Sequence, residues 1–352
     1  MSNFGQEKVR MSAELENLVF ENPLKKRELE CLRQRCESYQ MGDPKEWTGD
    51  IFRAYSRYFG FLSSLKVRAV LKELDSYGYL EALKAQPIQW IDFGAGTLGA
   101  SLGAVDYFKE HQIKIEKAIS VDQDLKPMQW AQKEFQNFLN LDIGMRTSLP
   151  DQNIYQNTIF VAVDVFNEMG LLAEKNALDE KAPFISMLKS ILQKMDEKSI
   201  LILIEPASKW INQNFLRLRN ILIKESHLLL PCTHQLACPA LEQREWCHED
   251  RDYLAPSQFW NLVHELGFQR STLSFSMLCF SKQQNIFQKT KARMVSRRIK
   301  SKGRCDKWLC SNGKRWKASI LERHESPENA AFFEAQRGDI IDCVSTGIKS
   351  PD

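Results

Sequence analysis

The chain has 352 residues, of which 43% are hydrophobic and 26% are charged, and its formal net charge is +3 at pH 7. This length allows one large α/β domain and a smaller unit, the composition is that of an ordinary soluble protein, and nine cysteines are too few for a disulfide scaffold. No apolar run reaches 18 residues, the N-terminus lacks an apolar signal core, and its acidic residues argue against a transit peptide, so we expect a cytoplasmic protein with no membrane span.

The first 85 residues are predicted to form a helical N-terminal region. A charged helix is expected over residues 27–39, and apolar residues recur mostly at three- and four-residue spacing between residues 47 and 83. An amphipathic region of this kind would cover one edge of a sheet or close over a bound ligand.

A glycine-rich stretch over residues 88–101 reads I-Q-W-I-D-F-G-A-G-T-L-G-A-S. An apolar run, a carboxylate and glycines spaced G-x-G-x-x-G predict a strand, a tight turn and a helix start, the opening unit of a nucleotide-binding α/β sheet. Gly94, Gly96 and Gly99 are expected to bind the cofactor, because a residue without Cβ lets the backbone approach a ligand and adopt positive φ.

The glycine spacing alone fits NAD or FAD as well as S-adenosylmethionine (SAM), and the neighbouring acids decide between them. Asp92 would lie where a dinucleotide places its pyrophosphate, and no Lys or Arg follows it before Phe108 to offset the repulsion. SAM instead carries an ammonium and a sulfonium, which a carboxylate attracts. The next apolar run ends at Asp122, which is placed to hold a ribose diol. The acids therefore favour a SAM-binding protein of the class I methyltransferase type.

Residues 86–230 are predicted to form this methyltransferase core, a Rossmann-like, doubly wound parallel sheet. Strands are expected over residues 88–93, 118–122, 157–165 and 199–206, a weakly marked strand between residues 140 and 151, and helices over residues 127–139, 182–195 and 215–229. Ligands bind at the carboxyl ends of such strands, where Asp164 joins Asp92 and Asp122. All three are predicted to bind SAM.

The catalytic residue cannot be named from the sequence. Asp164 is not followed by the Pro-Pro-aromatic motif of amino-directed methyltransferases. No cysteine lies beside Pro206, as a cytosine-C5 enzyme would require. The target atom therefore stays open.

Three cysteines, Cys232, Cys238 and Cys247, lie within sixteen residues, and a proline flanks each of the first two. Thiolates at turn positions are typical ligands of metal ions and iron–sulfur clusters in a reducing compartment. A fourth ligand must come from elsewhere in the chain. We favour Cys310 over Cys305, because Cys310 precedes a Ser-Asn-Gly turn that could direct its sulfur inward.

Zinc is the alternative metal, with His234 or His248 as a nitrogen ligand. His248 directly follows Cys247, and adjacent side chains of an extended segment diverge, so these two are not expected to bind one ion. Reduced, buried cysteines without a metal are the remaining interpretation.

A strongly basic segment carries twelve Lys and Arg between residues 289 and 317, against one acid, Asp306. Its local formal charge of +11 is typical of a surface that binds a phosphate backbone. Trp308 and Trp316 are interleaved with the cations and could stack on unpaired bases. We predict an ordered, RNA-facing element rather than a disordered loop. The predicted RNA contacts are Arg297, Arg298, Lys300, Lys302 and Arg304.

Several stretches together carry a family resemblance. They are residues 54–74, Asp92-Phe93-Gly94-Ala95-Gly96, Val121-Asp122, Val165-Phe166-Asn167-Glu168-Met169, Leu203-Ile204-Glu205-Pro206, the cysteine block from Pro231 to His248, Cys310 before Asn312-Gly313, and Arg337-Gly338-Asp339. The chain resembles the ribosomal small-subunit methyltransferase-like family of bacteria and mitochondria, over residues 50–342. The cysteine block joined to a methyltransferase core is the specific part of this resemblance.

The resemblance implies SAM binding, a four-cysteine 4Fe–4S cluster (alternatively zinc) on Cys232, Cys238, Cys247 and Cys310, and association with small-subunit rRNA. The cysteine block and the basic segment in turn predict a cysteine-rich, basic C-terminal unit over residues 231–352. Two functions stay open: a SAM-dependent methyltransferase acting on small-subunit rRNA, and a catalytically inactive assembly factor that binds SAM and a metal cluster. The protein is expected to be a monomer.

Overall fold

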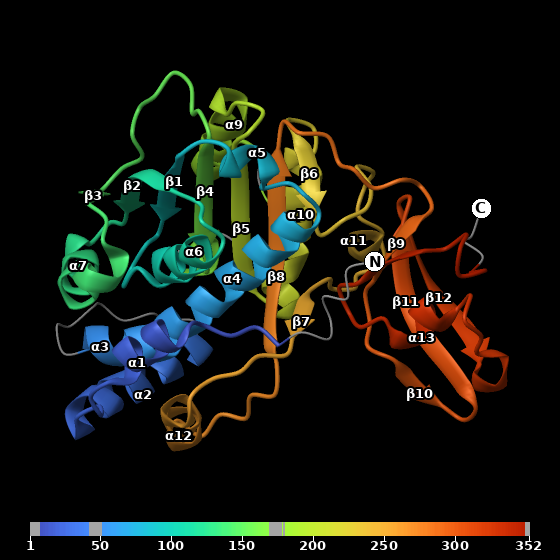
Figure 1. Ribbon diagram of the computed structural model, residues 1–352, viewed down its shortest axis with the longest axis horizontal. Coiled ribbons are helices and arrows are strands. Elements are labelled where there is room, and N and C mark those ends of the chain that lie inside the picture. Colours follow the sequence, from blue (N-terminus) through green and yellow to red (C-terminus); the bar gives the residue numbers. More distant parts are fainter. Residues whose placement is uncertain (1–7, 42–50, 169–177, 179, 349–352) are drawn as a thin grey trace.

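The computed structural model describes residues 8–41, 51–168, 178 and 180–348. It shows a central sheet with helices on both faces and, beside it, a smaller sheet built from the C-terminal residues (Figure 1). Within the described ranges, no helix has both the length and the apolar character needed to cross a bilayer.

The central sheet has the strand order of a class I methyltransferase. Its strands are β1 (Ile88–Phe93), β2 (Ile115–Val121), β3 (Ile143–Arg146), β4 (Thr158–Val163), β5 (Ile200–Pro206), β6 (His227–Leu230), β7 (Glu249–Arg251) and β8 (Leu273–Ser281). They are ordered β3-β2-β1-β4-β5-β8-β6, with β7 paired to β8. The first five of these are parallel, and β8 runs antiparallel to both β5 and β6. The predicted fold class is confirmed.

Helices cover both faces of this sheet. They are α1 (Ala13–Phe20), α2 (Lys26–Met41), α3 (Phe52–Tyr55), a π-helical turn η2 (Ser56–Gly60), α4 (Phe61–Ser76), α5 (Glu81–Lys84), α6 (Gly99–Glu110), α7 (Leu125–Leu139), α8 (Val165–Glu168), α9 (Pro183–Lys194), α10 (Lys209–Leu222), α11 (Pro239–Glu242) and α12 (Ser257–Glu265). Trp90 of β1 shares a core with α4, α6 and α7, whereas the next residue, Ile91, shares one with α9 and α10. Alternating side chains of each strand therefore fill two separate apolar layers.

Two features differ from the expected core. The helix predicted over residues 215–229 ends at Leu222, and residues 227–230 form β6 instead. Leu228, Leu229 and Leu230 are all fully buried. Consecutive buried residues fit a strand that helices cover on both faces, and they do not fit a helix with one apolar face. β8 follows residue 230 yet lies between β5 and β6. The core sheet therefore includes strands that precede residue 230 and strands that follow it.

The N-terminal helical region packs on a face of the sheet rather than along its edge. α4 lies against α6, and the two helices touch through glycines. A Cβ on Gly99 would come 2.7 Å from the carbonyl oxygen of Gly60, and one on Gly103 would come 2.3 Å from that of Ser64. Ser64 Oγ donates a 2.7 Å hydrogen bond to the Gly99 carbonyl. The third glycine of the motif is therefore required for helix packing.

The basic segment forms most of the second sheet, so it is ordered. Its strands are β9 (Lys291–Met294), β10 (Ile299–Ser301), β11 (Arg304–Ser311), β12 (Lys314–Leu321) and β13 (Ile340–Asp342), and α13 (Ala330–Glu334) covers it. The order is β10-β11-β9-β13, with β12 on the other side of β11. Asn312 and Gly313 both have positive φ, as the two central residues of a tight hairpin turn require.

Two acids and two arginines, which we call the buried ion network, join the C-terminal sheet to the core. Glu73 of α4 accepts 2.7 Å hydrogen bonds from Arg251 of β7 and Arg293 of β9. Glu249 of β7 accepts hydrogen bonds from the same two arginines, at 2.7 and 3.0 Å. All four side chains are at most 4% exposed. A Cβ on Gly338 would lie 2.4 Å from Arg251 Nη1, which explains the glycine in Arg337-Gly338-Asp339.

Candidate functional site

A cavity of about 940 Å³ opens at the carboxyl edge of the central sheet, where the ends of β1, β2 and β4 meet. Its size lies at the upper end of the range for small-molecule sites. Its lining includes the glycine loop after β1, the acids after β2 and β4, and Tyr55, Gly60 and Ser63 from the N-terminal region. The N-terminal region therefore closes one side of the cavity. Closing over a bound ligand was one of the two arrangements expected from the sequence.

Two glycines of the loop have positive φ, and only one of them has open space where a Cβ would lie. Gly94 has φ +75°, and a Cβ there would come 2.3 Å from Val165 Cγ2. Gly96 has φ +48°, and a Cβ there would meet no atom within 4 Å. Gly96 therefore faces the cavity directly, whereas Gly94 lets the chain pass Val165 at the start of α8.

Asp122 ties the end of β2 to the loop. Its Oδ2 accepts a 2.8 Å hydrogen bond from the Gly96 N–H, and its Oδ1 accepts one from the Asp124 N–H at 3.2 Å. Burial raises the pKa of the Asp122 carboxyl above its usual value. The carboxylate lines the cavity and keeps lone pairs available, as a ribose-binding acid must.

Asp92 lies beneath the loop rather than in the cavity. It is 1% exposed, and its Oδ2 accepts a 2.6 Å hydrogen bond from Ser101 Oγ, which in turn accepts one from Trp90 Nε1. Burial raises the pKa of Asp92 to about 7. The side chain holds the start of α6 against β1, and it is not among the described residues that line the cavity. The structure therefore places Asp92 beneath the glycine loop, and its contact with the cofactor stays a prediction.

Asp164 sits at the end of β4 in a left-handed conformation, with φ +59°. Lys66 of α4 pairs with its Oδ2 at 2.5 Å, and Lys66 itself is 8% exposed. The other carboxylate oxygen, Oδ1, is buried and has no hydrogen-bond partner among the described residues. Positive φ in a residue other than glycine is often found at functional sites. Asp164 therefore lines the cavity, with Oδ2 held by Lys66 and Oδ1 buried without a hydrogen-bond partner among the described residues.

Glu205, at the end of β5, supports this edge from below. It is fully buried and accepts hydrogen bonds from the backbone N–H groups of Phe166 and Asn167, at 3.0 and 3.2 Å. Burial, together with the nearby charge of Asp164, raises the pKa of Glu205 well above its usual value. Glu205 thus fixes the first turn of α8, and Asp164 and Glu168 are the acids that line the cavity on this side.

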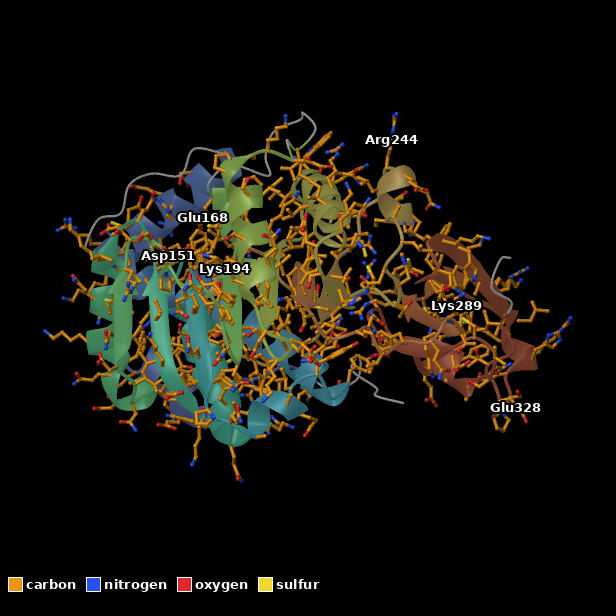
Figure 2. All side chains as sticks on the ribbon, turned by 90° about the horizontal axis from the view of Figure 1, so that it is seen from above. Asp151, Glu168, Lys194, Arg244, Lys289 and Glu328 are labelled. Atoms are coloured by element: carbon orange, nitrogen blue, oxygen red, sulfur yellow. The ribbon has the colours of Figure 1, made fainter. Side chains whose placement is uncertain are left out.

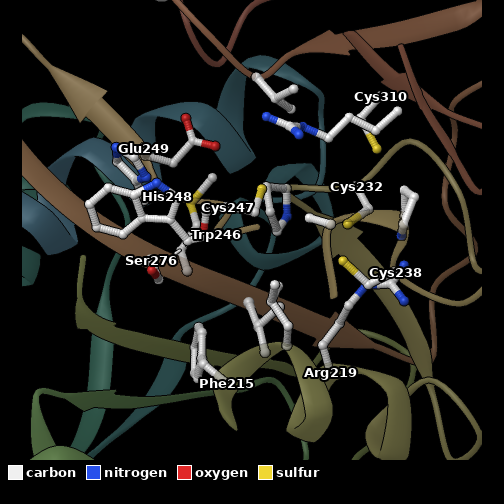
Figure 3. Close-up of a pocket in the computed structure, with 18 of the residues that line it drawn as sticks. Phe215, Arg219, Cys232, Cys238, Trp246, Cys247, His248, Glu249, Ser276 and Cys310 are labelled. Atoms are coloured by element: carbon white, nitrogen blue, oxygen red, sulfur yellow. Dashed lines mark hydrogen bonds between the residues drawn. The ribbon is translucent and has the colours of Figure 1, made fainter. Parts of the chain in front are cut away.

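A second, enclosed cavity, which we call the cysteine pocket, lies between α10, the loop after β6, β7 and β11 (Figure 3). Cys232, Cys238, Cys247 and Cys310 all line it, so the structure brings the four predicted ligands together. Burial raises the pKa of Cys247 to about 12 and that of Cys310 well above its usual value, and the neighbouring cysteines add to both shifts. In the described ranges, no three His, Cys, Asp or Glu side chains already stand at metal-binding distance.

The structure also distinguishes the two candidates for a fourth ligand. Cys310 and Cys305 are five residues apart on β11, so they point to opposite faces of the strand. Cys310 faces the cysteine pocket, whereas Cys305 is fully buried in the core of the C-terminal sheet beside Phe332. Cys305 is therefore too far from the other thiols to act with them.

Both histidines that were considered as zinc ligands have other partners. His234 Nδ1 accepts a hydrogen bond from the Leu236 N–H, so the ring proton lies on Nε2, 3.8 Å from Cys310 Sγ. Burial lowers the pKa of His234 to about 4, which keeps the ring neutral. His248 lies between Arg337 and Asp250, at 3.3 and 3.6 Å. Both histidines thus line the pocket with partners of their own, and His234 contacts Cys310 there.

The cations of the basic segment do not all face solvent, contrary to the simple charge count. Arg293 belongs to the buried ion network, and Lys307 is 1% exposed. Lys307 Nζ donates hydrogen bonds to the carbonyl groups of Phe332, Phe333 and Ala335, at the end of α13. Burial lowers the pKa of Lys307. Two of the twelve positive charges therefore stabilise the fold and are unavailable to RNA.

Four of the five predicted RNA-binding side chains are exposed. Arg297, Arg298, Lys302 and Arg304 lie on or beside β10 and the turn after it, and the Lys300 side chain lies outside the described part of the structure. Several cations of the basic segment have acidic neighbours. Arg298 pairs with Glu322. Arg304 and Lys317 lie 3.8 and 3.6 Å from Asp306. Arg315 stacks on Trp308, with 4.5 Å from its guanidinium carbon to the ring centroid.

Sequence reasoning missed two buried cations at these sites. Lys66 pairs with Asp164, and Arg219 of α10 lines the cysteine pocket. Both interrupt apolar stretches of amphipathic helices, Lys66 between Leu65 and Val67 and Arg219 after Leu218. A lone cation on the buried side of a helix was the available signal, because such a charge requires a partner in the core.

The strand order, the glycine loop and the acids after β2 and β4 define a protein of the class I methyltransferase type. A family model described as mitochondrial small ribosomal subunit Rsm22 matches residues 65–341, more than three quarters of the chain. The chain belongs to this family.

Among solved structures, the chain is similar to an uncharacterized protein from Burkholderia thailandensis, with 11% identity, a TM-score of 0.39 and coverage of 72% of this chain and 92% of that one. It is similar to magnesium protoporphyrin IX methyltransferase from Synechocystis PCC 6803 with bound SAM, at 12% identity, a TM-score of 0.38 and coverage of 73% and 97%. A putative RNA methyltransferase from Pyrococcus horikoshii shares 12% identity, with a TM-score of 0.33 and coverage of 64% and 83%. No curated protein matches the chain.

Proposed function

We propose that this protein binds SAM in the cavity beside the glycine loop and methylates rRNA of the small ribosomal subunit. One observation carries the proposal: the cavity at the carboxyl edge of a class I sheet is lined by glycine backbone and by four acids, against two cations, Arg35 and Lys126. These acids are Asp122, Asp124, Asp164 and Glu168. Family membership supports the ribosomal target.

The donors in the cavity fit SAM. Asp122 and Asp164 end strands two places apart in the sheet, on either side of the glycine loop, which separates their backbones by about 10 Å at ordinary strand spacing. The unpaired Oδ1 of Asp164 suits a cationic or hydrogen-bond-donating group, and Asp122 suits the ribose diol. A dinucleotide pyrophosphate would instead meet two carboxylates.

Bound SAM supplies an activated methyl group. Within the cavity, Lys66 holds Oδ2 of Asp164, so Oδ1 keeps a fixed position from which it can accept a hydrogen bond. The hydrogen bond from Tyr55 to Glu168, at 3.2 Å, brings the N-terminal region against the segment after β4. This contact helps exclude water from the cofactor. We expect methyl transfer onto immature small subunits, which an inactive assembly factor would not perform.

Calorimetric titration should show that the wild-type protein binds SAM. The Gly96→Val variant should bind it at least about tenfold more weakly, because the valine side chain would project into the cavity from a position with positive φ. Asp122→Asn should also weaken binding by removing the charge beside the ribose. The matched control is Asp142→Asn, an exposed acid outside the cavity, which should bind as the wild type does. Tighter binding of NADH than of SAM by the wild type would refute the cofactor assignment.

We propose further that Cys232, Cys238, Cys247 and Cys310 hold a 4Fe–4S cluster, with zinc as the alternative. The support is chemical: four thiols from three separate segments line one enclosed pocket, and both nearby histidines are engaged elsewhere. Because no three donors yet stand at coordination distance, binding requires the cysteine side chains to turn inward.

The third part of the proposal is that the C-terminal sheet binds rRNA through its exposed cations. Figure 2 shows Lys289 and Glu328 in the C-terminal unit that contains this sheet, well apart along the long axis from Glu168 at the cavity. Cys310 faces the cysteine pocket from the same strand, β11, that carries Arg304 at its other end. A metal at the pocket would therefore fix the orientation of the RNA-facing strands.

Binding to small-subunit rRNA should weaken steeply with salt, and replacing Arg297, Arg304 and Lys317 by alanine should reduce the slope by about two, since each phosphate contact to a single strand contributes about 0.7. The control replaces Lys114, Lys117 and Lys133, three exposed cations of the core, which removes the same charge. Both sets should leave SAM affinity unchanged. Equal slopes for the two triple variants would show that RNA binds elsewhere.

The three regions expected from the sequence are proposed as a division of roles. Residues 1–85 close the cavity, residues 86–230 supply the SAM-binding edge, and residues 231–352 carry the metal and RNA contacts. A monomeric state and a cytoplasmic location stay predictions, and the family description adds the mitochondrion as a candidate compartment.

A further inference from the structure

Arg219 is a buried arginine, like those of the buried ion network, but it belongs to the cysteine pocket. Its Nη1 donates 2.7 Å hydrogen bonds to the Leu236 carbonyl and to Asn220 Oδ1, and its Nη2 donates to the His234 carbonyl at 3.2 Å. Its Nε is buried without a hydrogen-bond partner in the described structure. The guanidinium thus holds the loop between Cys232 and Cys238 and still has one donor unused.

No carboxylate of the described residues lies within ion-pair distance of Arg219, although an arginine side chain carries its charge at any physiological pH. The groups near it that can become negative are the thiols of Cys232, Cys238 and Cys310. Figure 3 shows the Arg219 side chain rising from α10 toward Cys238 and Cys232. An isolated charge in the protein interior is strongly unfavourable, so this position requires an anionic neighbour.

The other acid at the pocket cannot supply that neighbour. Glu249 lines the same pocket, but both of its oxygens are held by Arg251 and Arg293. The remaining neighbours of Arg219 are neutral, because His234 and Asn220 act through a backbone carbonyl and an amide. The counter-charge must therefore come from thiolates, and a bound metal keeps the cysteines in this deprotonated form.

We propose that Arg219 is the charge-compensating residue of an anionic, thiolate-ligated metal centre in the cysteine pocket. This inference rests on the metal centre proposed above and assigns a role to a residue outside its ligand set. Four thiolates on a divalent ion, or on a cluster core of charge +2, leave a net charge of −2, which one guanidinium reduces to −1. Hydrogen bonds and positive charge beside such a centre also set its reduction potential.

The test uses the full chain under anaerobic, reducing conditions, with zinc(II) as the probe and a chromophoric chelator as competitor. Arg219→Met should bind zinc about 10-fold to 100-fold more weakly than the wild type, the range expected for losing a hydrogen bond to a charged group. Arg219→Lys keeps the charge and should stay within about tenfold of the wild type. The control is Arg217→Met, on the same helix but outside the pocket, where the arginine bonds to Asn214.

The stability gained from metal separates this role from a purely structural one. Arg219→Met also removes three hydrogen bonds that hold the loop, so the test compares the gain from metal: saturating zinc should raise the unfolding midpoint of the variant by less than it raises that of the wild type. If Arg219 only fixed the loop through carbonyl hydrogen bonds, the metal-free variant would be destabilised and its zinc affinity would be unchanged. That result would overturn the proposal. A wild-type chain that binds no zinc, and holds no iron as purified, would refute the metal centre itself, together with this role for Arg219.

Discussion

Replacing Glu73 by alanine should destabilise the folded protein by about 3–5 kcal/mol, the typical cost of leaving a buried charge without its partner. Arg251 and Arg293 would each lose a 2.7 Å hydrogen bond and would be left with Glu249 as their common acid. Urea unfolding followed by circular dichroism measures the change. Hydrogen exchange should show the largest loss of protection in β7 and β9.

The matched control is Glu81→Ala, which removes an acid from the neighbouring helix α5. Glu81 pairs with Lys84, but its side chain is 64% exposed, so its loss should cost at most about 1 kcal/mol. If both variants unfold at the same urea concentration, the buried ion network does not stabilise the fold. Burial alone would raise the pKa of Glu249, yet the charges of Arg293 and Arg251 lower it below its ordinary value of 4.5. The contribution of Glu249 to the free energy of unfolding is therefore present above pH 4.5 and is lost as the pH falls below that value.

Changing Cys238 to serine should remove the metal and, with it, much of the order of the cysteine pocket. Protein purified without oxygen should be brown and carry about four irons per chain if the centre is a cubane cluster. The bound metal would connect the loop after β6, the segment before β7, and β11. Because ligand binding to the native state adds directly to folding free energy, metal loss should lower the unfolding midpoint and increase hydrogen exchange in β11.

The control is Cys31→Ser, a partly exposed cysteine of α2 outside the pocket, which should keep full metal content and stability. Elemental analysis distinguishes the outcomes. Colourless protein with one zinc per chain would replace the iron–sulfur assignment by the zinc alternative. A wild-type protein containing neither metal would show that the four thiols are reduced, buried cysteines.

The sequence predicted most of the central sheet because its signals are local. The bounds of β1 agree with the predicted strand over residues 88–93, and α9 and β5 agree to within one residue at each end. Each is marked by a continuous apolar run or by helical periodicity next to glycine or proline. β6 was missed because its four residues continue the apolar pattern of α10, and only pairing with β8 decides their conformation.

The site was predicted less completely because its details depend on contacts between distant segments. The glycine loop and Asp122 lie where the motif placed them, but Asp92 turns toward Ser101 and away from the cavity. No local pattern distinguishes those two orientations of a strand-end acid. The charge count of the basic segment likewise could not show that Arg293 and Lys307 point inward, since that depends on Glu73 and on the end of α13.

The buried ion network has a consequence for the order in which the chain is made. Glu73 leaves the ribosome 220 residues before Arg293, and 178 residues before Arg251. Until Arg251 has been synthesised, helix α4 carries this carboxylate without a partner from the network, and until Arg293 follows it has only one of its two partners. The buried ion network of the nascent protein is therefore complete only after translation has passed β9. A truncated chain that stops after the central sheet contains Arg251 but lacks Arg293, so incomplete copies should be less stable and more readily proteolysed than the full chain.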